Sequence, residues 1–173
     1  MYLVCNNPSP FILQNGSVIR VCAGAGYTPF FDRATSFRGP YTTPKINITC
    51  SRLAADQNLS KGFHSEDAMV WPDKRGNLHM LSHAITANTE WHDASGVHAF
   101  SDDGGFSWQC GEVPPYNGTI VYESGETMFV TKRERPKLLL GEQGQPLVLF
   151  TAITQHNHDV DDYSFTLATP IAQ

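Results

Sequence analysis

The sequence has no long apolar run and no excess of basic residues. No apolar stretch approaches the roughly 20 residues that a membrane-spanning helix requires. The first residues have neither the basic start nor the apolar length of a signal peptide. Twelve Lys and Arg against seventeen Asp and Glu give a net charge of −5. An acidic surface gains nothing from phosphates, so we expect neither a nucleic-acid partner nor a membrane partner.

Helical periodicity and several cofactor motifs are missing too. No stretch of a dozen residues keeps an i, i+3, i+4, i+7 apolar pattern, so long helices are not expected. The four cysteines include no CxxC pair, and we expect no metal and no other cofactor. A glycine-rich phosphate loop and a G-x-S-x-G motif are also absent. What is present, 40% hydrophobic residues with 14 Gly and 11 Pro in 173 residues, favours an all-β fold.

The chain repeats one layout three times: an apolar strand, a glycine turn and a second apolar strand. This layout is typical of a β-hairpin. The turn glycines are Gly16, Gly76 and Gly144. The polar residues that precede them by nine or ten positions are Asn7, Asp67 and Glu134.

A repeat of roughly 60 residues with further short strands between the hairpins predicts the blade of a β-propeller. We expect four-stranded antiparallel blades at about residues 1–60, 61–125 and 126–173. A β-sandwich with accidental internal similarity is the alternative. Because three blades do not close a wheel, the length predicts a partial propeller, with exposed sheet edges through which the chain self-associates.

One motif sharpens the propeller prediction. The segment Ser101-Asp102-Asp103-Gly104-Gly105-Phe106-Ser107-Trp108 fits the pattern S-x-D-x-G-x-[ST]-W and resembles the Asp-box of sialidases and related propellers. Asp103 can accept N–H bonds within the turn, Gly105 can take a positive φ, and Trp108 can pack beneath the hairpin, while Ser101 opens the motif. The motif therefore indicates architecture rather than activity.

The three polar positions point to glycan chemistry. Carboxylates that converge from neighbouring blades can protonate a glycosidic oxygen and activate water or attack the sugar. With Asp67 before an apolar strand and Glu134-Arg135-Pro136 as an E-x-P motif, the chain resembles the five-bladed β-propeller glycoside hydrolases, which include arabinanases, β-xylosidases, levanases and invertases. The resemblance implies about three blades of such a wheel and two catalytic residues, with Glu134 as general acid and Asp67 to orient or tune it.

Asn7 departs from the pattern of this superfamily. The position before Pro8 is where the superfamily carries a catalytic Asp, and an amide cannot act as a base. Either the activity is damaged or absent, or these are the last three blades of a wheel whose acids lie upstream. The second explanation makes Asp67 and Glu134 binding residues at the channel mouth.

Further residues are candidates for substrate binding. They are Asn7, Glu66, Arg135, His83 and His98. The expected function is hydrolysis of O-glycosidic bonds in a polysaccharide or oligosaccharide. The alternatives are a propeller that binds carbohydrate without catalysis and, from the Asp-box, a sialidase-like enzyme. A sialidase would need three converging arginines, and five are available in Arg20, Arg33, Arg38, Arg75 and Arg135.

Four N-x-[ST] patterns bear on the compartment. Chance supplies only about one or two in a chain of this composition. They predict glycosylation and a secreted or lumenal protein, and ordinary polar turns are the alternative. The acceptor residues are Asn15, Asn47, Asn58 and Asn117.

Overall fold

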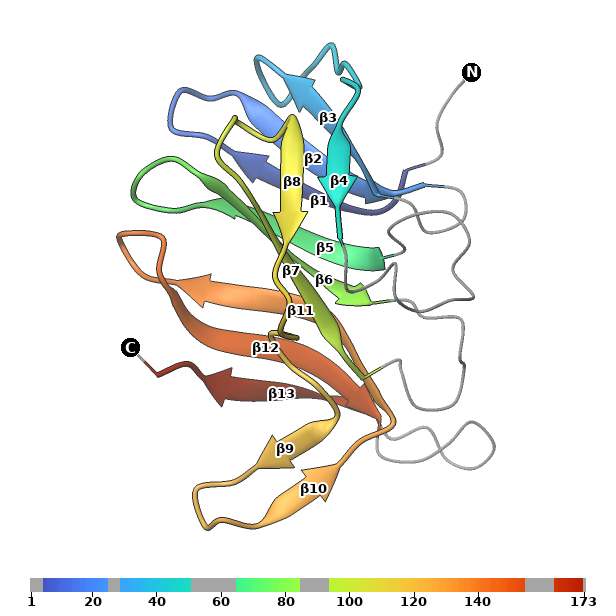
Figure 1. Cartoon of the computed structure of the whole chain (residues 1–173). Helices are drawn as coiled ribbons and strands as arrows, with labels where there is room; N and C mark the ends of the chain where they lie inside the picture. Colours follow the sequence, from blue (N-terminus) through green and yellow to red (C-terminus); the bar gives the residue numbers. More distant parts are fainter. Residues whose placement is uncertain (1–4, 25–28, 51–64, 85–93, 155–163, 173) are drawn as a thin grey trace.

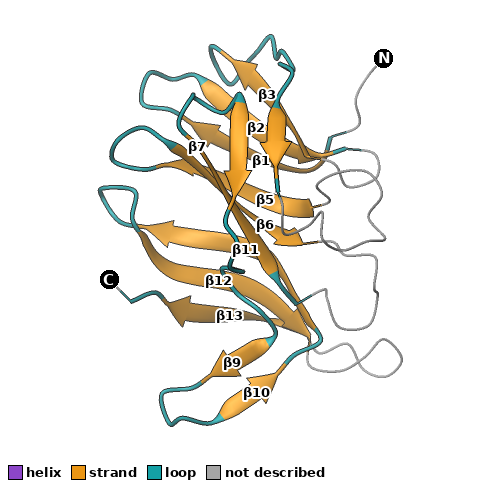
Figure 2. Cartoon of the chain, viewed as in Figure 1, coloured by secondary structure: helices purple, strands orange, loops and turns teal. Residues whose placement is uncertain are grey.

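The computed structural model describes residues 5–24, 29–50, 65–84, 94–154 and 164–172. Within these ranges the chain consists of thirteen strands and no helix, which confirms the prediction of an all-β chain (Figure 1; Figure 2). The described part contains no helix that is long and apolar enough to cross a membrane.

The strands are, in chain order, β1 (Asn6–Ile12), β2 (Val18–Ala23), β3 (Pro29–Ala34), β4 (Asn47–Thr49), β5 (Ser65–Pro72), β6 (Leu78–Ala84), β7 (Gly96–Ser101), β8 (Ser107–Cys110), β9 (Thr119–Val121), β10 (Thr127–Phe129), β11 (Lys132–Leu140), β12 (Pro146–Thr154) and β13 (Ser164–Pro170).

The strands form three main sheets and one separate hairpin. The first sheet has the order β1-β2-β3 and the last sheet β11-β12-β13, both antiparallel. The middle sheet has the order β4-β8-β7-β6-β5, and β4 runs parallel to β8. Four antiparallel strands in chain order therefore occur in the middle sheet, whereas the other two sheets have three described strands each. The strand that follows the first sheet in the chain, β4, joins the edge of the middle sheet.

Three equivalent hairpins organise the molecule: β1–β2, β5–β6 and β11–β12. Their turns lie on the same side of the molecule (Figure 1). Gly16, Gly76 and Gly144 have φ values of 82°, 87° and 76°, and each donates its N–H to the carbonyl three residues earlier. No atom lies within 4 Å of a Cβ built at Gly16 or Gly76. The left-handed backbone, rather than lack of space, therefore requires glycine at these two positions.

The core lies between the sheets. The first and middle sheets bury a cluster that includes Ile19, Phe31, Met80 and Trp108, and the rings of Phe31 and Trp108 stack at 4.8 Å between centroids. The middle and last sheets bury Trp71, Leu81, Tyr116 and Leu149. The hairpin β9–β10 packs on the last sheet through Ile120, Val130 and Ile153.

The Asp-box segment forms the turn between β7 and β8. Asp103 accepts hydrogen bonds from the backbone N–H groups of Phe106 and Ser107, both at 2.9 Å, and from the hydroxyls of Ser101 and Ser107. Gly105 has a φ of 91°, and the Trp108 indole donates to the Gly105 carbonyl at 3.1 Å. The Arg33 guanidinium of the first sheet donates to the Gly104 carbonyl. The motif thus closes its own hairpin and connects two sheets.

Two disulfides connect elements along the chain. Cys5 is bonded to Cys22 in β2, and Cys50, after β4, is bonded to Cys110 in β8. The described residues include no free cysteine. Because disulfides persist in oxidising compartments, this pairing is consistent with a secreted protein.

Candidate active site

The first strands of the three hairpins, β1, β5 and β11, share an irregularity at the end opposite the glycine turns. The pairing register shifts between Asn6 and Ser9, between Glu66 and Met69, and between Glu134 and Lys137. One residue in each interval has a positive φ: Asn7 (48°), Asp67 (55°) and Arg135 (54°). These are the non-glycine residues with positive φ in the described part of the chain. Such bulges redirect side chains, and strained backbone of this kind is concentrated at functional sites.

The bulges correct the alignment of the third repeat. Asn7, Asp67 and Arg135 each lie nine residues before their turn glycine, so Arg135 is the structural equivalent of Asp67. Glu134, which the sequence pattern matched to Asp67, is instead the equivalent of Glu66. Glu134 shares its charge with Asp67, but Arg135 shares its backbone conformation and its distance from the turn glycine.

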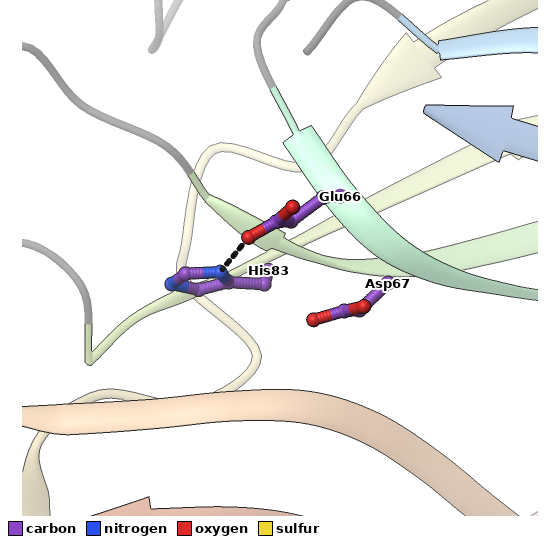
Figure 3. A group of neighbouring side chains, drawn as sticks. All are labelled: Glu66, Asp67 and His83. Atoms are coloured by element: carbon purple, nitrogen blue, oxygen red, sulfur yellow. Dashed lines mark ion pairs between the residues drawn. The ribbon is translucent and has the colours of Figure 1, made fainter. Parts of the chain in front are cut away.

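Glu66, Asp67 and His83 form the centre of the candidate site (Figure 3). One oxygen or nitrogen atom from each lies within 4.8 Å of the other two. Neighbouring residues in a regular strand point to opposite faces, but the left-handed backbone at Asp67 brings its carboxylate to the side of Glu66. His83 reaches the group because its residue pairs with Glu66 across β5 and β6.

The Glu66 carboxylate is held from two sides. Its Oε1 lies 3.8 Å from the His83 Nδ1, and its Oε2 accepts a hydrogen bond of 3.3 Å from the Asn7 amide. Burial, followed by the negative charge of Asp67, raises the pKa of Glu66, and Glu134 adds to this effect. His83 and Arg135 act in the opposite direction without reversing it. The Glu66 side chain remains 23% exposed, so it is both perturbed and accessible.

The last sheet contributes charged groups from β11. Glu134 lies 3.9 Å from the Lys132 ammonium and is 24% exposed. The charges of Glu134 and Arg135 both act on Glu66, so the bulges of β5 and β11 supply one site. Asn7, Glu66, Asp67, His83, Glu134 and Arg135 are therefore the residues of the candidate site.

Two residues of this region were not predicted as site residues. Lys137 donates to the backbone carbonyls of Asp67 and Ala68, at 3.3 and 3.4 Å, and so connects β11 to the bulge of β5. Tyr116 packs its ring against Gly96, and burial raises the pKa of its hydroxyl, with Asp67 and Glu134 contributing. A lysine in an apolar strand was the available signal for Lys137. No sequence signal indicated that Tyr116 is buried.

His98 is placed in different surroundings from His83. Its Nε2 lies 3.0 Å from the His79 Nδ1, and its ring lies 6.1 Å from that of Trp71. Burial, followed by the charge of His79, lowers the pKa of His98 to about 4, so it is neutral near pH 7. Together with Trp71 it lines a groove of about 550 Å³ between the middle and last sheets.

A larger hollow lies away from the carboxylates. Its volume is about 750 Å³, and it is lined by the three glycine turns, with Leu13, Asp73 and Gly141 among its residues. This end of the hairpins carries none of the converging carboxylates. We therefore place the candidate site at the bulges, by chemistry rather than by volume.

The same centre could hold a divalent cation. Two carboxylates and an imidazole are ligands that transition metals accept, and Glu66, Asp67 and His83 offer them within reach of one another. The sequence predicted no metal, because it contains no CxxC pair. The pairing of β5 with β6 and the backbone at Asp67 bring these three side chains together.

The arginines that a sialidase would need have separate partners. Arg20 pairs with Asp32, Arg75 pairs with Asp73, and Arg33 contacts Gly104. Arg38 lies over the ring of Phe37 at 5.3 Å. Of the five arginines, Arg135 is the one whose charge affects the pKa of Glu66.

Three of the four predicted glycosylation positions are exposed. Asn15 lies in the first glycine turn, Asn47 in β4, and Asn117 just before β9. The side chains of Asn15 and Asn117 each accept a hydrogen bond from the backbone two residues later. Asn58 lies outside the described residues.

Comparisons with known proteins identify the fold alone. No family model matches the sequence, and no curated protein matches it. The structure is similar to that of a Bifidobacterium bifidum S17 protein provisionally assigned as an exo-β-1,3-galactanase, with a TM-score of 0.63 and 12% identity. The match covers 97% of this chain and 49% of the other, so this chain spans about half of that protein's length. An ulvan lyase of polysaccharide lyase family PL25, bound to a GlcA–Rha3S saccharide, is similar at a TM-score of 0.47 and 13% identity, over 96% of this chain and 37% of the other.

Proposed function

We propose that this protein is a carbohydrate-active enzyme that hydrolyses O-glycosidic bonds at the bulged ends of β1, β5 and β11. The observation that carries the proposal is the clustering of Glu66 with Asp67 and His83, to which Glu134 and Arg135 of β11 add charges that affect the pKa of Glu66. Glycoside hydrolysis needs two carboxyl groups in different protonation states. The galactanase whose fold this chain shares provides independent support for a glycan substrate.

We also propose that the three sheets are blades of a β-propeller, with β1, β5 and β11 innermost. The repeated hairpins, the bulge at the same position of each inner strand and the Asp-box turn support this architecture. The remaining blades of a wheel would lie outside this chain. The two disulfides and the exposed sequons support a secreted glycoprotein.

The roles of the carboxyl groups follow from their surroundings. Glu66 is the proton donor, because burial and neighbouring carboxylates favour its protonated form. Asp67 or Glu134, as a carboxylate, takes a proton from water or attacks the anomeric carbon. In the first case the proton of Glu66 passes to the leaving oxygen, hydroxide from water bonds to the anomeric carbon, and the carboxylate accepts the remaining proton. This assignment places the acid at Glu66, whereas the sequence pattern placed it at Glu134.

The assignment can be tested with two substrates for one sugar, one with an alkyl and one with a dinitrophenyl leaving group. A good leaving group needs no protonation, so Glu66→Gln should lose about 10²–10⁴-fold on the alkyl glycoside and far less on the dinitrophenyl glycoside. Asp67→Asn and Glu134→Gln should show which carboxylate is needed for both substrates. Glu112→Gln, an exposed residue outside the site, is the matched control.

A glycan array with the unmodified chain separates catalysis from binding. Turnover of a bound glycan supports the proposal. Binding without turnover, unchanged by Glu66→Gln and Glu134→Gln, would replace it with a carbohydrate-binding function. That result would favour the explanation in which Asn7 marks lost chemistry.

A further inference from the structure

Arg133 of β11 is a buried cation that has no carboxylate partner among the described residues. It is 4% exposed, and its guanidinium donates to the Thr151 hydroxyl at 3.1 Å, the Asn117 carbonyl at 3.0 Å and the Thr169 hydroxyl at 3.1 Å. All three acceptors are uncharged. Burial lowers the pKa of Arg133, and the neighbour that raises it is Tyr116 rather than an acid. Because a buried arginine is normally paired with an opposite charge, the described chain leaves Arg133 without its counter-ion.

The Arg133 guanidinium has donors left for a ligand. An arginine side chain carries five N–H groups, and the three bonds use one on each of its nitrogen atoms. One N–H on Nη1 and one on Nη2 therefore have no acceptor in the part of the chain that the structure describes. Arginine binds carboxylates and similar oxyanions most strongly through two donors at once. Arg133 thus has two donors available to an anionic group.

Arg133 lines the groove of about 550 Å³ between the middle and last sheets. This volume is in the range of sites that bind small molecules. The described residues of its lining include no Asp, Glu or Lys, although the whole chain has a net charge of −5. His98, which also lines it, is neutral near pH 7. Arg133 therefore gives this groove a positive charge in an otherwise acidic protein.

The other walls of the groove suit a sugar ring. They are largely apolar and are formed by proline, leucine and aromatic residues, among them Pro114, Pro115, Leu138 and Pro170. A sugar has apolar C–H faces as well as polar substituents. Such a ring can therefore pack against these walls while a charged substituent binds to Arg133.

The groove adjoins the candidate active site through Tyr116. The Tyr116 ring lines the groove and lies 5.1 Å from the Arg133 guanidinium. The charges of Asp67 and Glu134 also act on the Tyr116 hydroxyl and contribute to its raised pKa. One glycan can therefore reach both the groove and the carboxylates.

We propose that this groove binds an acidic sugar residue of a glycan, whose carboxylate or sulfate group pairs with Arg133. The bound anion supplies the counter-ion that the described chain lacks, and the apolar walls hold the ring. The choice of an anion rests on Arg133, whereas the choice of a sugar over another organic anion rests on the proposed carbohydrate function. The substrate class of the adjoining site is then an acidic polysaccharide or oligosaccharide.

NMR titration of the isotope-labelled chain tests the proposal with four probes: methyl β-glucuronide, a methyl glucoside monosulfate, methyl β-glucoside and acetate. We expect an acidic sugar to bind at least about tenfold more tightly than the neutral glucoside and than acetate, and to shift the Arg133 Nε–H signal. The two acidic probes show whether a carboxylate or a sulfate is preferred. Equal affinity for the neutral glucoside, equal affinity for acetate, or no binding of either acidic sugar would overturn the proposal.

Two variants of equal size change only the charge beside Arg133. Thr169→Asp places a carboxylate where the Thr169 hydroxyl accepts the Arg133 bond, and Thr169→Asn is its uncharged control. The Asp variant has an internal counter-ion, so it should bind the acidic sugar at least about tenfold more weakly than the Asn variant and unfold at a higher temperature. Thermal unfolding also verifies that both variants fold. Equal binding by the two variants, or equal unfolding temperatures, contradicts the proposal.

The outcome is separate from that of the proposed hydrolysis, because the titration measures no turnover. Binding of an acidic sugar without hydrolysis of any glycan would uphold the groove as a binding site and reject the hydrolase. Hydrolysis of a neutral glycan, with no acidic sugar bound in the groove, would do the reverse.

Discussion

Asp103 and Glu66 are both acidic side chains of the middle sheet and its turns, and their pKa values are shifted in opposite directions. Hydrogen bonds from Ser107 and Ser101 hold the pKa of Asp103 well below its usual range. Burial and the neighbouring Asp67 raise the pKa of Glu66. Asp103 accepts four bonds from its own turn, whereas Glu66 has one amide donor and a histidine 3.8 Å away.

The contrast separates a structural carboxylate from a reactive one. A carboxylate that is satisfied by donors within its own hairpin stabilises the fold and has no proton to give near pH 7. A carboxylate that is held beside other carboxylates is costly to ionise, and the fold tolerates this cost at a site where chemistry needs it. The five predictions that follow test this difference.

The largest effect is expected in the core beneath the Asp-box. Trp108 is 1% exposed and stacks on Phe31, so Trp108→Ala should lower the free energy of unfolding by about 3–5 kcal/mol. Urea unfolding followed by circular dichroism measures the change. Phe106→Ala, two residues earlier and half exposed, is the control and should change stability by less than about 1 kcal/mol.

The pH dependence of stability should report on Asp103. Because its pKa is lower in the folded than in the unfolded chain, its stabilisation is complete above about pH 4 and is lost as the pH falls. Asp103→Asn should therefore lower the urea midpoint at pH 7 and reduce the loss between pH 5 and pH 2. Asp102→Asn is the neighbouring control. An equal change in the urea midpoint in this variant would contradict a specific stabilising role of Asp103.

Asn7 distinguishes two explanations of the site. Asn7→Asp keeps a residue that tolerates positive φ but places a further carboxylate beside Glu66, so it should raise the Glu66 pKa and lower stability by about 1 kcal/mol at pH 7. Asn7→Gly retains the backbone freedom without the charge. Carboxyl NMR titration measures the pKa in both variants. A gain of hydrolysis in Asn7→Asp would instead show that this position needs an acid.

At pH 7, Glu66→Gln should change the stability of the chain in the opposite direction to Asp103→Asn. The pKa of Glu66 is higher in the folded than in the unfolded chain. Such a group lowers the free energy of unfolding as the pH rises from its unfolded pKa to its folded pKa. The substitution should thus stabilise the chain at pH 7, by less than about 1 kcal/mol, and have no such benefit at pH 3. Thermal unfolding at the two pH values measures the difference, and a loss of stability at pH 7 contradicts it.

The smallest effect is expected at the Lys132–Glu134 ion pair. The two groups are 3.9 Å apart and partly exposed, so Lys132→Gln should change stability by less than about 0.5 kcal/mol. A larger loss in urea unfolding would make Glu134 a structural carboxylate like Asp103. Lys74→Gln, at a glycine turn, provides the comparison.

The sequence predicted the hairpins because apolar periodicity and turn glycines are local signals, and the Asp-box because the bonds that Asp103 accepts all lie within eight residues. It matched Glu134 to the wrong position because charge repeats less faithfully than backbone conformation does. It gave Glu66 only a binding role, since the burial that chiefly raises the pKa of that residue, and the charges of His83 and Glu134 that also affect it, depend on other strands.

The all-β class, the three hairpins and the Asp-box turn were thus determined by the sequence alone, because neighbouring residues decide strand, turn and cap. The tertiary structure decided which acid has a raised pKa and which histidine lies beside it. Burial and charge interactions depend on distances between residues that are far apart in the chain. Asn7 and Glu66, 59 residues apart and joined by one hydrogen bond, show this dependence directly.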